Sequence, residues 1–420
     1  MHKQPIRCSS IVLSFALLAL VGAGPTPASA QVKIGPGTVY QYGQDDGFSF
    51  LSDDMPAGEG PYDGVASCTC TQCNSDRNWV TTEFMIWWGK RRQLPPLVTS
   101  SPQSEPRATA GVIGQPGTTV LFGDERVDAG ERFGGRVTVG QWLDDGKEIG
   151  IGGSFFALEE CGVRYSMASI GDPILARPFF DTFQGQNAAA LIAFPSVNSG
   201  SIDVHSASDV LGAEFFVRRL LTANCGNRLD LIGGYYFTRV DDGLTISSST
   251  LIVDPGGLAA VGTTIDLVDV FGVRNEFHGG ELGLLLERGR GCWTWKVLGK
   301  VSIGNLNQTV TVHGETVTTP SGGPAATGTG GLLARPSNSG TFERNEFIYV
   351  PEASVNLSRR LNEHLDVSLG YTFIYWSSIL LAADQVDMSV NPNGGTSPAF
   401  TFNDTDFWVQ GVNVGLEFHY

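Results

Sequence analysis

Cysteine is the residue type with the clearest chemical potential in this sequence. Residues 68–73 place three thiols close together, but one cluster without a second pair of ligands is a poor match to a structural zinc site. Six cysteines follow position 30, and an even number favours disulfides in an exported chain. Cys225 and Cys292 fall in two short turns, and sequence leaves open whether they can bridge. We expect no metal, and disulfides among Cys68, Cys70, Cys73, Cys161, Cys225 and Cys292.

A hydrolytic site is the second chemistry to consider. His205 lies near Ser206, Ser208 and Asp209, which are residue types that can supply a base and a nucleophile. Hydroxyls that line a polar cavity give the same composition, and the sequence has no Gly-x-Ser-x-Gly, His-Glu-x-x-His or phosphate-loop motif. We therefore expect no enzyme and no cofactor, and keep a hydrolase built on His205 as the least favoured alternative.

Two arginines occur in a repeated pattern. Ile-Leu-Ala-Arg-Pro at 174–178 and Leu-Leu-Ala-Arg-Pro at 332–336 both fall in long segments rich in Gly, Pro, Ser and Thr. If those segments fold into a pore, Arg177 and Arg335 could form a charged constriction that orients solutes. The competing and favoured interpretation is that each arginine fastens its own loop through hydrogen bonds.

The composition limits the class of protein to which these residues can belong. The 420 residues have a formal net charge of −16, are 41% hydrophobic and only 17% charged, and include 54 glycines. Such hydrophobic content excludes a disordered chain. The negative charge argues against a duplex nucleic-acid partner, because it repels phosphate.

The N-terminus has the pattern of an export signal. Lys3 and Arg7 precede an apolar run at 11–21, and Ala-Ser-Ala at 28–30 resembles a cleavage site. The run is shorter than the roughly 20 residues of a spanning helix, which disfavours an anchor. We expect a signal peptide at 1–30 and a flexible leader at 31–78.

From position 79 onward, hydrophobic residues recur with a period of two, the pattern of β-strands. Many runs approach the ten residues with which a tilted strand crosses a bilayer. Long links at 94–130, 171–200 and 316–342 alternate with short turns, as in barrels with loops at one rim. We expect an all-β, single-domain transmembrane antiparallel up-and-down barrel at 79–420 with roughly 12 strands (range 10–14), and a soluble sandwich as the alternative.

The same alternation assigns side chains to faces. A cation that faces lipid at the bilayer midplane costs roughly 2–4 kcal/mol, so charged strand residues should face the lumen. We expect this of Arg228, Lys296, Lys300 and Asp366. Aromatic residues near run ends are expected in the interfacial girdles, namely Trp87, Trp88, Tyr375, Trp376, Trp408 and Tyr420.

The C-terminal stretch 413–420 has the pattern of the assembly signal of outer-membrane barrels. Its key positions are polar Asn413, Gly415, apolar Phe418 and terminal Tyr420. An ordinary last strand could have the same alternation. With the N-terminal signal, however, the pattern favours an outer-membrane location.

Five short motifs resemble one known family. They are EFMIWW at 83–88, LPPLVT at 94–99, TTVLFG at 118–123, LARPFF at 175–180 and DFWVQG at 406–411. In this order they resemble the putative beta barrel porin-7 family, outer-membrane barrels of planctomycete-type bacteria. The resemblance covers about 79–420 and implies a pore-type barrel without an established substrate. Tyr236 departs from the basic residue expected after Gly-Tyr, so a family-wide lumen charge is not carried over.

These observations together favour a porin-like channel for passive diffusion of small hydrophilic solutes, with some preference for cations. The alternative is a structural or surface-display barrel whose lumen is plugged, because small barrels are filled by side chains. The expected partners are outer-membrane lipids, the barrel-assembly machinery and those solutes. The sequence leaves open whether the chain forms a homo-oligomer.

Overall fold

The described part of the chain forms a closed β-barrel. The computed structural model describes residues 4–5, 76–127, 130–254 and 259–420. In this part ten antiparallel strands pair in a ring, and the last strand, β19, pairs with the first, β2. The predicted all-β barrel is confirmed, with a strand number at the lower end of the expected range. The ring, in order, consists of β2 (Asn78–Gly89), β7 (Arg132–Trp142), β8 (Ile149–Ser169), β11 (Asn198–Asn224), β12 (Asn227–Ile252), β13 (Thr264–Arg290), β14 (Trp293–Thr319), β16 (Gly340–Arg360), β17 (Leu365–Leu380) and β19 (Asp404–His419).

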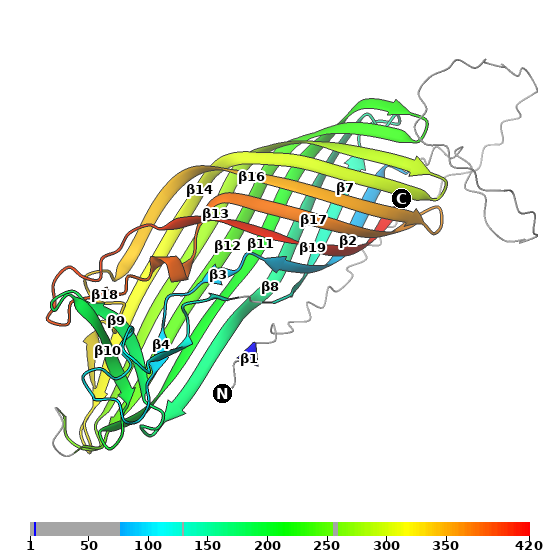
Figure 1. Cartoon of the computed structure of the whole chain (residues 1–420). Helices are drawn as coiled ribbons and strands as arrows, with labels where there is room; N and C mark the ends of the chain where they lie inside the picture. The colour runs from blue at the N-terminus through cyan, green and yellow to red at the C-terminus, as the bar shows by residue number, and fades with distance from the viewer. Residues whose placement is uncertain (1–3, 6–75, 128–129, 255–258) are drawn as a thin grey trace, which may run out of the picture. The chain divides into compact units, whose positions relative to one another are not determined.

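The two rims of the barrel differ in their connections. At one rim two residues join β11 to β12 and two join β13 to β14, and we call this the turn rim. The links at the opposite, loop rim are long, and several of their short strands gather there (Figure 1). The strands β4, β5, β9 and β10 form a small separate sheet, which β18 joins. The remaining elements are β1 (Gln4–Pro5), β3 (Arg92–Gln93), β4 (Val98–Ser100), β5 (Thr119–Phe122), β6 (Arg126–Val127), β9 (Leu175–Asp181), β10 (Gln186–Ala193), β15 (Ala326–Thr329), the 3-10 helix η1 (Ala382–Gln385) and β18 (Ser389–Val390).

The outer face of the barrel changes character along each long strand. On β14 the outward side chains from Trp293 to Ile303 are apolar and 37–50% exposed, apart from a glycine. The next outward positions are polar, beginning with Asn305 and Asn307 and ending with His313. Eleven residues match the length with which a tilted strand crosses hydrocarbon. The turn-rim part of the barrel therefore fits a bilayer, and the rest of each long strand continues into water.

The inner face changes in the opposite sense. Towards the loop rim, inward residues such as Leu244, Ile246 and Phe271 are fully buried in one apolar cluster with residues from the long links, including Leu97 and Leu333. Where the outer wall meets water, apolar side chains must turn inward, as in any soluble protein. The predicted arrangement, apolar outward and polar inward, thus describes the turn-rim part and is reversed beyond it.

A second apolar cluster crosses the lumen near its middle. Every barrel strand except β7 contributes to it. Trp87 and Trp376 belong to this cluster and have 0% exposure, so their predicted place in the interfacial girdle is wrong. Successive side chains of a strand point to opposite faces, so only one residue of each aromatic pair can face lipid. The neighbours Trp88 and Tyr375 do face outward, where their rings contact outer-face tyrosines.

Two predictions concern the N-terminal region. The expected signal peptide at 1–30 and leader at 31–78 lie almost entirely outside the described residues. The first barrel strand begins at Asn78, next to the expected boundary at 79. Within the described ranges, no helix has the length and hydrophobicity needed to cross a membrane.

Candidate functional site

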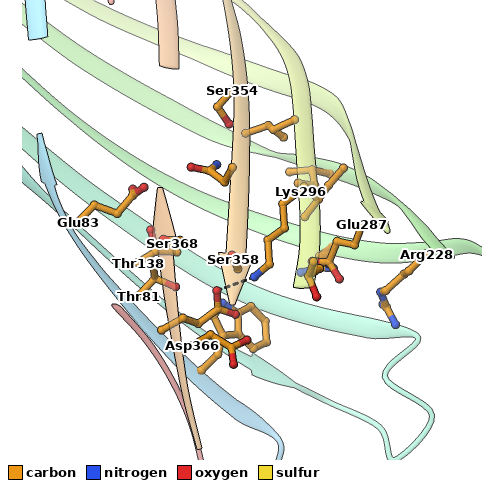
Figure 2. A pocket seen from close by; sticks show the side chains of 18 of the residues that line it. Thr81, Glu83, Thr138, Arg228, Glu287, Lys296, Ser354, Ser358, Asp366 and Ser368 are labelled. Carbon is orange, nitrogen blue, oxygen red and sulfur yellow. Dashed lines mark hydrogen bonds and ion pairs between the residues drawn. The ribbon is translucent and has the colours of Figure 1, made fainter. Parts of the chain in front are cut away.

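The charged residues of the lumen surround a chamber near the turn rim. It has a volume of about 350 Å³ and is lined by residues of every barrel strand except β8. Figure 2 shows side chains from different strands gathered around it, among them Glu83, Lys296 and Asp366. The apolar cluster that crosses the lumen lies further towards the loop rim. On β12, for example, Arg228 of the chamber precedes Tyr236 and Val240 of the cluster.

Lys300 is the centre of the first group of charges. Its Nζ lies 3.1 Å from a carboxylate oxygen of Glu281 and 3.3 Å from one of Glu352, and it also pairs with Glu214. The side chain of Lys300 is 3% exposed, and its ammonium lies 4.7 Å from the ring centre of Tyr236. A buried cation is tolerable only when anions compensate it, so this group depends on all its members.

A second group lies closer to the turn rim. Arg218 donates to Asp230 and, at 2.8 Å, to Glu287, while Arg228 donates to the same oxygen of Asp230 at 2.8 Å. Arg218 and Arg228 also lie over the ring of Trp142, with guanidinium-to-centroid distances of 4.9 and 4.5 Å. The stacked arginines hold the rim of the lumen together through charge and ring contacts.

Several polar atoms around the chamber have unused hydrogen-bonding capacity. They include Oδ1 of Asn356 and the hydroxyl of Ser358, both in lining residues and buried without a hydrogen-bond partner. Buried polar atoms of this kind are usually satisfied by water. The chamber is therefore suited to hold water or a small polar solute.

The four strand residues predicted to face the lumen all line this chamber. Arg228 comes from β12 and Lys296 from β14, Lys300 lies two inward positions further along β14, and Asp366 reaches in from β17. Lys296 pairs with Glu417, and Asp366 accepts a hydrogen bond from Arg360 at 3.4 Å. The structure thus brings all four into one site.

Sequence reasoning missed the other charges of the site. Some of them carried a usable signal, because Glu83, Glu214 and Glu281 are single charges in apolar or glycine-rich strand segments, where the cost of facing lipid requires an inward direction. Arg136, for instance, lies 3.7 Å from Glu83 and 3.6 Å from Glu352. The missed residues are Glu83, Arg136, Glu214, Arg218, Asp230, Glu281, Glu287, Glu352 and Glu417.

The two repeated arginines are not brought together as a constriction. Arg177 is 2% exposed and forms a buried ion pair with Asp269 of β13. Arg335 is half-buried, and its backbone N–H donates to Asn338 at 2.8 Å. For Arg177 the structure matches the loop-fastening interpretation, although the acceptor is a wall carboxylate and not the loop's own backbone.

The C-terminal residues close the ring. Asn413 faces the lumen, where it accepts a hydrogen bond from the indole of Trp87 at 2.6 Å and donates one to Thr372 at 2.7 Å. Gly415 follows on the same inner face, and Phe418 and Tyr420 are exposed on the outside at 41% and 63%. The strand that carries the predicted assembly signal is therefore the one that seals the barrel.

The cysteines take different roles. Cys161 of β8 and Cys292 of the β13–β14 turn are disulfide-bonded cysteines. Cys225 is an exposed free thiol, so the expectation that it takes part in a disulfide is wrong, and the open question of a bridge to Cys292 is answered in the negative. Cys68, Cys70 and Cys73 lie outside the described residues. Among the described residues, no group of three or more His, Cys, Asp or Glu side chains could hold a metal ion.

The residues of the hydrolase alternative lie on opposite faces of β11. Ser206 and Ser208 point inward and are buried, and Ser208 accepts a hydrogen bond from Arg132 at 2.7 Å. His205 and Asp209 alternate with them and face outward. The strand itself separates the imidazole from the hydroxyls, so this part of β11 does not assemble a base with a nucleophile.

Comparison with known proteins adds one decisive match. Residues 79–420 match the model of a family described as putative beta barrel porin-7. Among curated protein sequences, none matches this chain. Structural comparison aligns the chain with the outer membrane protease OmpT from Escherichia coli (10% identity, 82% of this chain and 97% of that chain covered, TM-score 0.40). It also aligns it with the translocator domain of the autotransporter NalP from Neisseria meningitidis (9% identity, 83% and 90% covered, TM-score 0.25). The family match spans residues 79–420, which hold all ten strands of the barrel but for the first residue of β2, and this chain therefore belongs to the putative beta barrel porin-7 family.

Proposed function

We propose that this protein is a structural outer-membrane barrel with a closed lumen, the alternative that sequence analysis placed second. One observation carries the proposal, namely the apolar cluster that crosses the lumen. Its largest members come from strands around the ring and have 0–2% exposure. They are Trp87, Tyr236, Phe277, Trp376 and Phe407.

The energetic argument concerns what an open state would require. A hydrated solute can pass only if these five side chains lose their mutual contacts and meet water. Exposure costs roughly 1.5–3 kcal/mol for each large apolar side chain, or about 10 kcal/mol for the group. A conformation at that free energy is populated by on the order of one molecule in ten million.

The layer on the loop side adds to the closure. Leu97, Leu175 and Leu333 from three different links pack against inward residues of the wall in the larger apolar cluster. Polar anchors hold these links in place, because Arg92 pairs with Asp242 and Arg177 with Asp269. The links therefore support a stable cap, which suits a surface-display or structural role.

Passive diffusion of small hydrophilic solutes is the second candidate. The family description, which names a porin, and the charged chamber favour it. In this version the links and the crossing cluster move aside, and the chamber is the inner mouth of the pore. Its lining has six carboxylates and seven lysine and arginine side chains, so the chamber itself does not supply the cation preference that the sequence suggested.

Solute entry into proteoliposomes separates the two candidates. The full mature chain is reconstituted into vesicles that are then diluted into isotonic arabinose, and an open porin in parallel vesicles provides the positive control. The closed barrel predicts no swelling above that of protein-free vesicles. Swelling at a rate comparable to the porin would overturn the structural role and favour diffusion.

The route to the membrane is part of the same proposal. We infer that the chain is exported with cleavage after Ala30 and that the barrel-assembly machinery recognises its last strand, with Phe418 and Tyr420 on the outer face. N-terminal sequencing of the protein from outer membranes tests the first step, and Gln31 is the expected first residue. Deletion of Tyr420 tests the second, with an expected loss of membrane-inserted protein.

A further inference from the structure

A second cavity lies on the loop-rim side of the apolar part of the outer face, which we call the apolar band. Its volume is about 730 Å³, and its lining comes from the end of β2 and the link after it, from β6, from η1 and from the start of β19. Two tryptophans of the lining, Trp88 and Trp408, have outward-facing rings that contact Tyr371 and Phe373 of the outer wall. Tryptophan is enriched at the level of lipid headgroups. The cavity thus begins where the hydrocarbon ends.

The lining of this cavity has more cationic than anionic side chains, unlike the chain as a whole. Its lining contains the cations Lys90, Arg91, Arg92 and Arg126 and the anions Glu131 and Asp384, and just outside the lining Asp406 and Asp242 pair with Lys90 and Arg92. The whole chain has a net charge of −16. In an acidic protein, a group of cationic side chains at one place attracts anions that the rest of the surface repels.

Two of these arginines have donors to offer. Arg92 is 4% exposed, and its Nη1 donates to Asp242 at 2.5 Å, but its Nη2 is buried without a hydrogen-bond partner. An unpaired buried guanidinium N–H is costly, and an anion would satisfy it. Arg126 is exposed, and its side chain has no ion-pair partner among the described residues.

Lys90 differs from the two arginines in its hydrogen bonding. Its ammonium already donates to Asp406 at 2.6 Å, to the backbone oxygen of Asp406 at 3.0 Å and to Thr405 at 3.2 Å. All three of its protons are in use and Asp406 balances its charge, so Lys90 offers no free donor. The two arginines, whose planar groups match a phosphate, are left to make the direct contacts.

We propose that this cavity binds the phosphate of an anionic membrane lipid, with Arg92 and Arg126 as its hydrogen-bond donors and Trp88 and Trp408 beside the glycerol and first acyl carbons. A soluble phosphate would be bound by the same arginines, but the tryptophans at the edge of the apolar band favour a ligand that is itself anchored in the bilayer. The lipid would fasten the link after β2 to the wall at the level of the outer headgroups.

Native mass spectrometry of the full chain in a neutral maltoside detergent tests this proposal. The probes are phosphatidylglycerol and phosphatidylcholine with identical acyl chains, and inorganic phosphate. The expected result is retention of one phosphatidylglycerol in preference to phosphatidylcholine. Retention without preference would show general lipid adhesion and would overturn the proposal, and so would displacement by millimolar inorganic phosphate, which would identify a soluble phosphate as the ligand.

Matched variants locate the site. Arg126→Gln removes an exposed donor and should weaken phosphatidylglycerol binding about tenfold. Arg92→Lys keeps the charge beside Asp242 but loses the second donor, and should also weaken it. Arg107→Gln changes an exposed arginine of the same link outside the cavity and should leave binding unchanged. Equal binding by Arg126→Gln and Arg107→Gln, with both proteins showing the thermal unfolding of the original chain, would contradict the site.

Discussion

Arg177 on β9 and Asp269 on β13 form an ion pair that is almost completely buried, with side chains 2% and 0% exposed. The other oxygen of Asp269 accepts hydrogen bonds from the backbone N–H groups of Leu333 and Ala334, at 3.0 and 2.7 Å. One carboxylate of the wall therefore holds both copies of the repeated Leu-Ala-Arg-Pro pattern. The repeat fastens two links to the same place inside the barrel and leaves no charged pair to form a constriction.

Replacement of Arg177 by Ala should destabilise the protein strongly. It leaves a buried carboxylate without its cation, and loss of one partner from a buried pair costs about 3–5 kcal/mol. Arg335→Ala removes a half-buried side chain of the sister motif and should cost less than about 1 kcal/mol. Urea unfolding in lipid vesicles measures both free energies. Similar losses for the two variants would contradict the asymmetry of the two arginines.

Lys300→Met should also destabilise the barrel, by about 3–5 kcal/mol. Glu214, Glu281 and Glu352 then face one another without the central cation. Lys300→Arg keeps the charge and is the control, with an expected loss of less than half that amount. The free energy of unfolding in vesicles is the measurement. A Met variant as stable as the Arg variant would show that this group does not support the lumen.

On the outer face, the cost of introducing a cation should depend on its position along the strand relative to the apolar band. Val297 lies in the middle of the apolar stretch of β14, and Val297→Arg should cost about 2–4 kcal/mol of unfolding free energy. Asn307→Arg changes an outward residue of the same strand above the band and should change stability by less than about 0.5 kcal/mol. Equal losses of unfolding free energy in the two variants would mean that the apolar stretch of β14 is not the part that crosses the membrane.

The cap should respond to pH through Asp384 of η1. Burial, with a smaller contribution from Asp242, raises the pKa of Asp384 to about 6, and Lys90 opposes the shift. The other charged groups of the cavity are Arg91, Arg92, Arg126 and Glu131. A carboxyl whose pKa is higher in the folded state than in the unfolded state binds more protons when folded, so its contribution to stability falls as pH rises from about 4 to 6.

Asp384→Asn tests this effect. The substituted amide cannot ionise, so the decline in stability between pH 4 and 6 should be smaller than in the original chain. Unfolding free energies at four pH values across this window provide the comparison. Parallel pH profiles for the two proteins would exclude Asp384 as the responsible group.

Part of this structure could be predicted from the sequence because the information is local. Alternation along β14 places Lys296 and Lys300 on one face and Trp295 and Val297 on the other, and the cost of a cation in lipid then decides which face is inside. The same logic would have found Glu281. The five motifs identified the family for a similar reason, since each is contiguous.

The rest depends on contacts that are distant in sequence. Leu244 and Ile246 alternate with Ser247 and Ser249 as regularly as residues in the membrane band do, and a period of two does not say which face meets water. The ring order shows that this end lies beyond the band, where the links fill the interior. Likewise, Trp87 and Trp88 are indistinguishable until the register of β2 fixes which one points inward. The partner of Arg177 lies on a strand that sequence reasoning had no means to select.

Single-channel recording from the purified mature chain in a planar bilayer tests the closed lumen most directly. The account predicts a silent membrane at voltages up to about 100 mV, with insertion verified by protease protection of the reconstituted barrel. Discrete and reproducible current steps that scale with the amount of inserted protein would contradict it, because ions would then be passing the layer that contains Trp87 and Trp376.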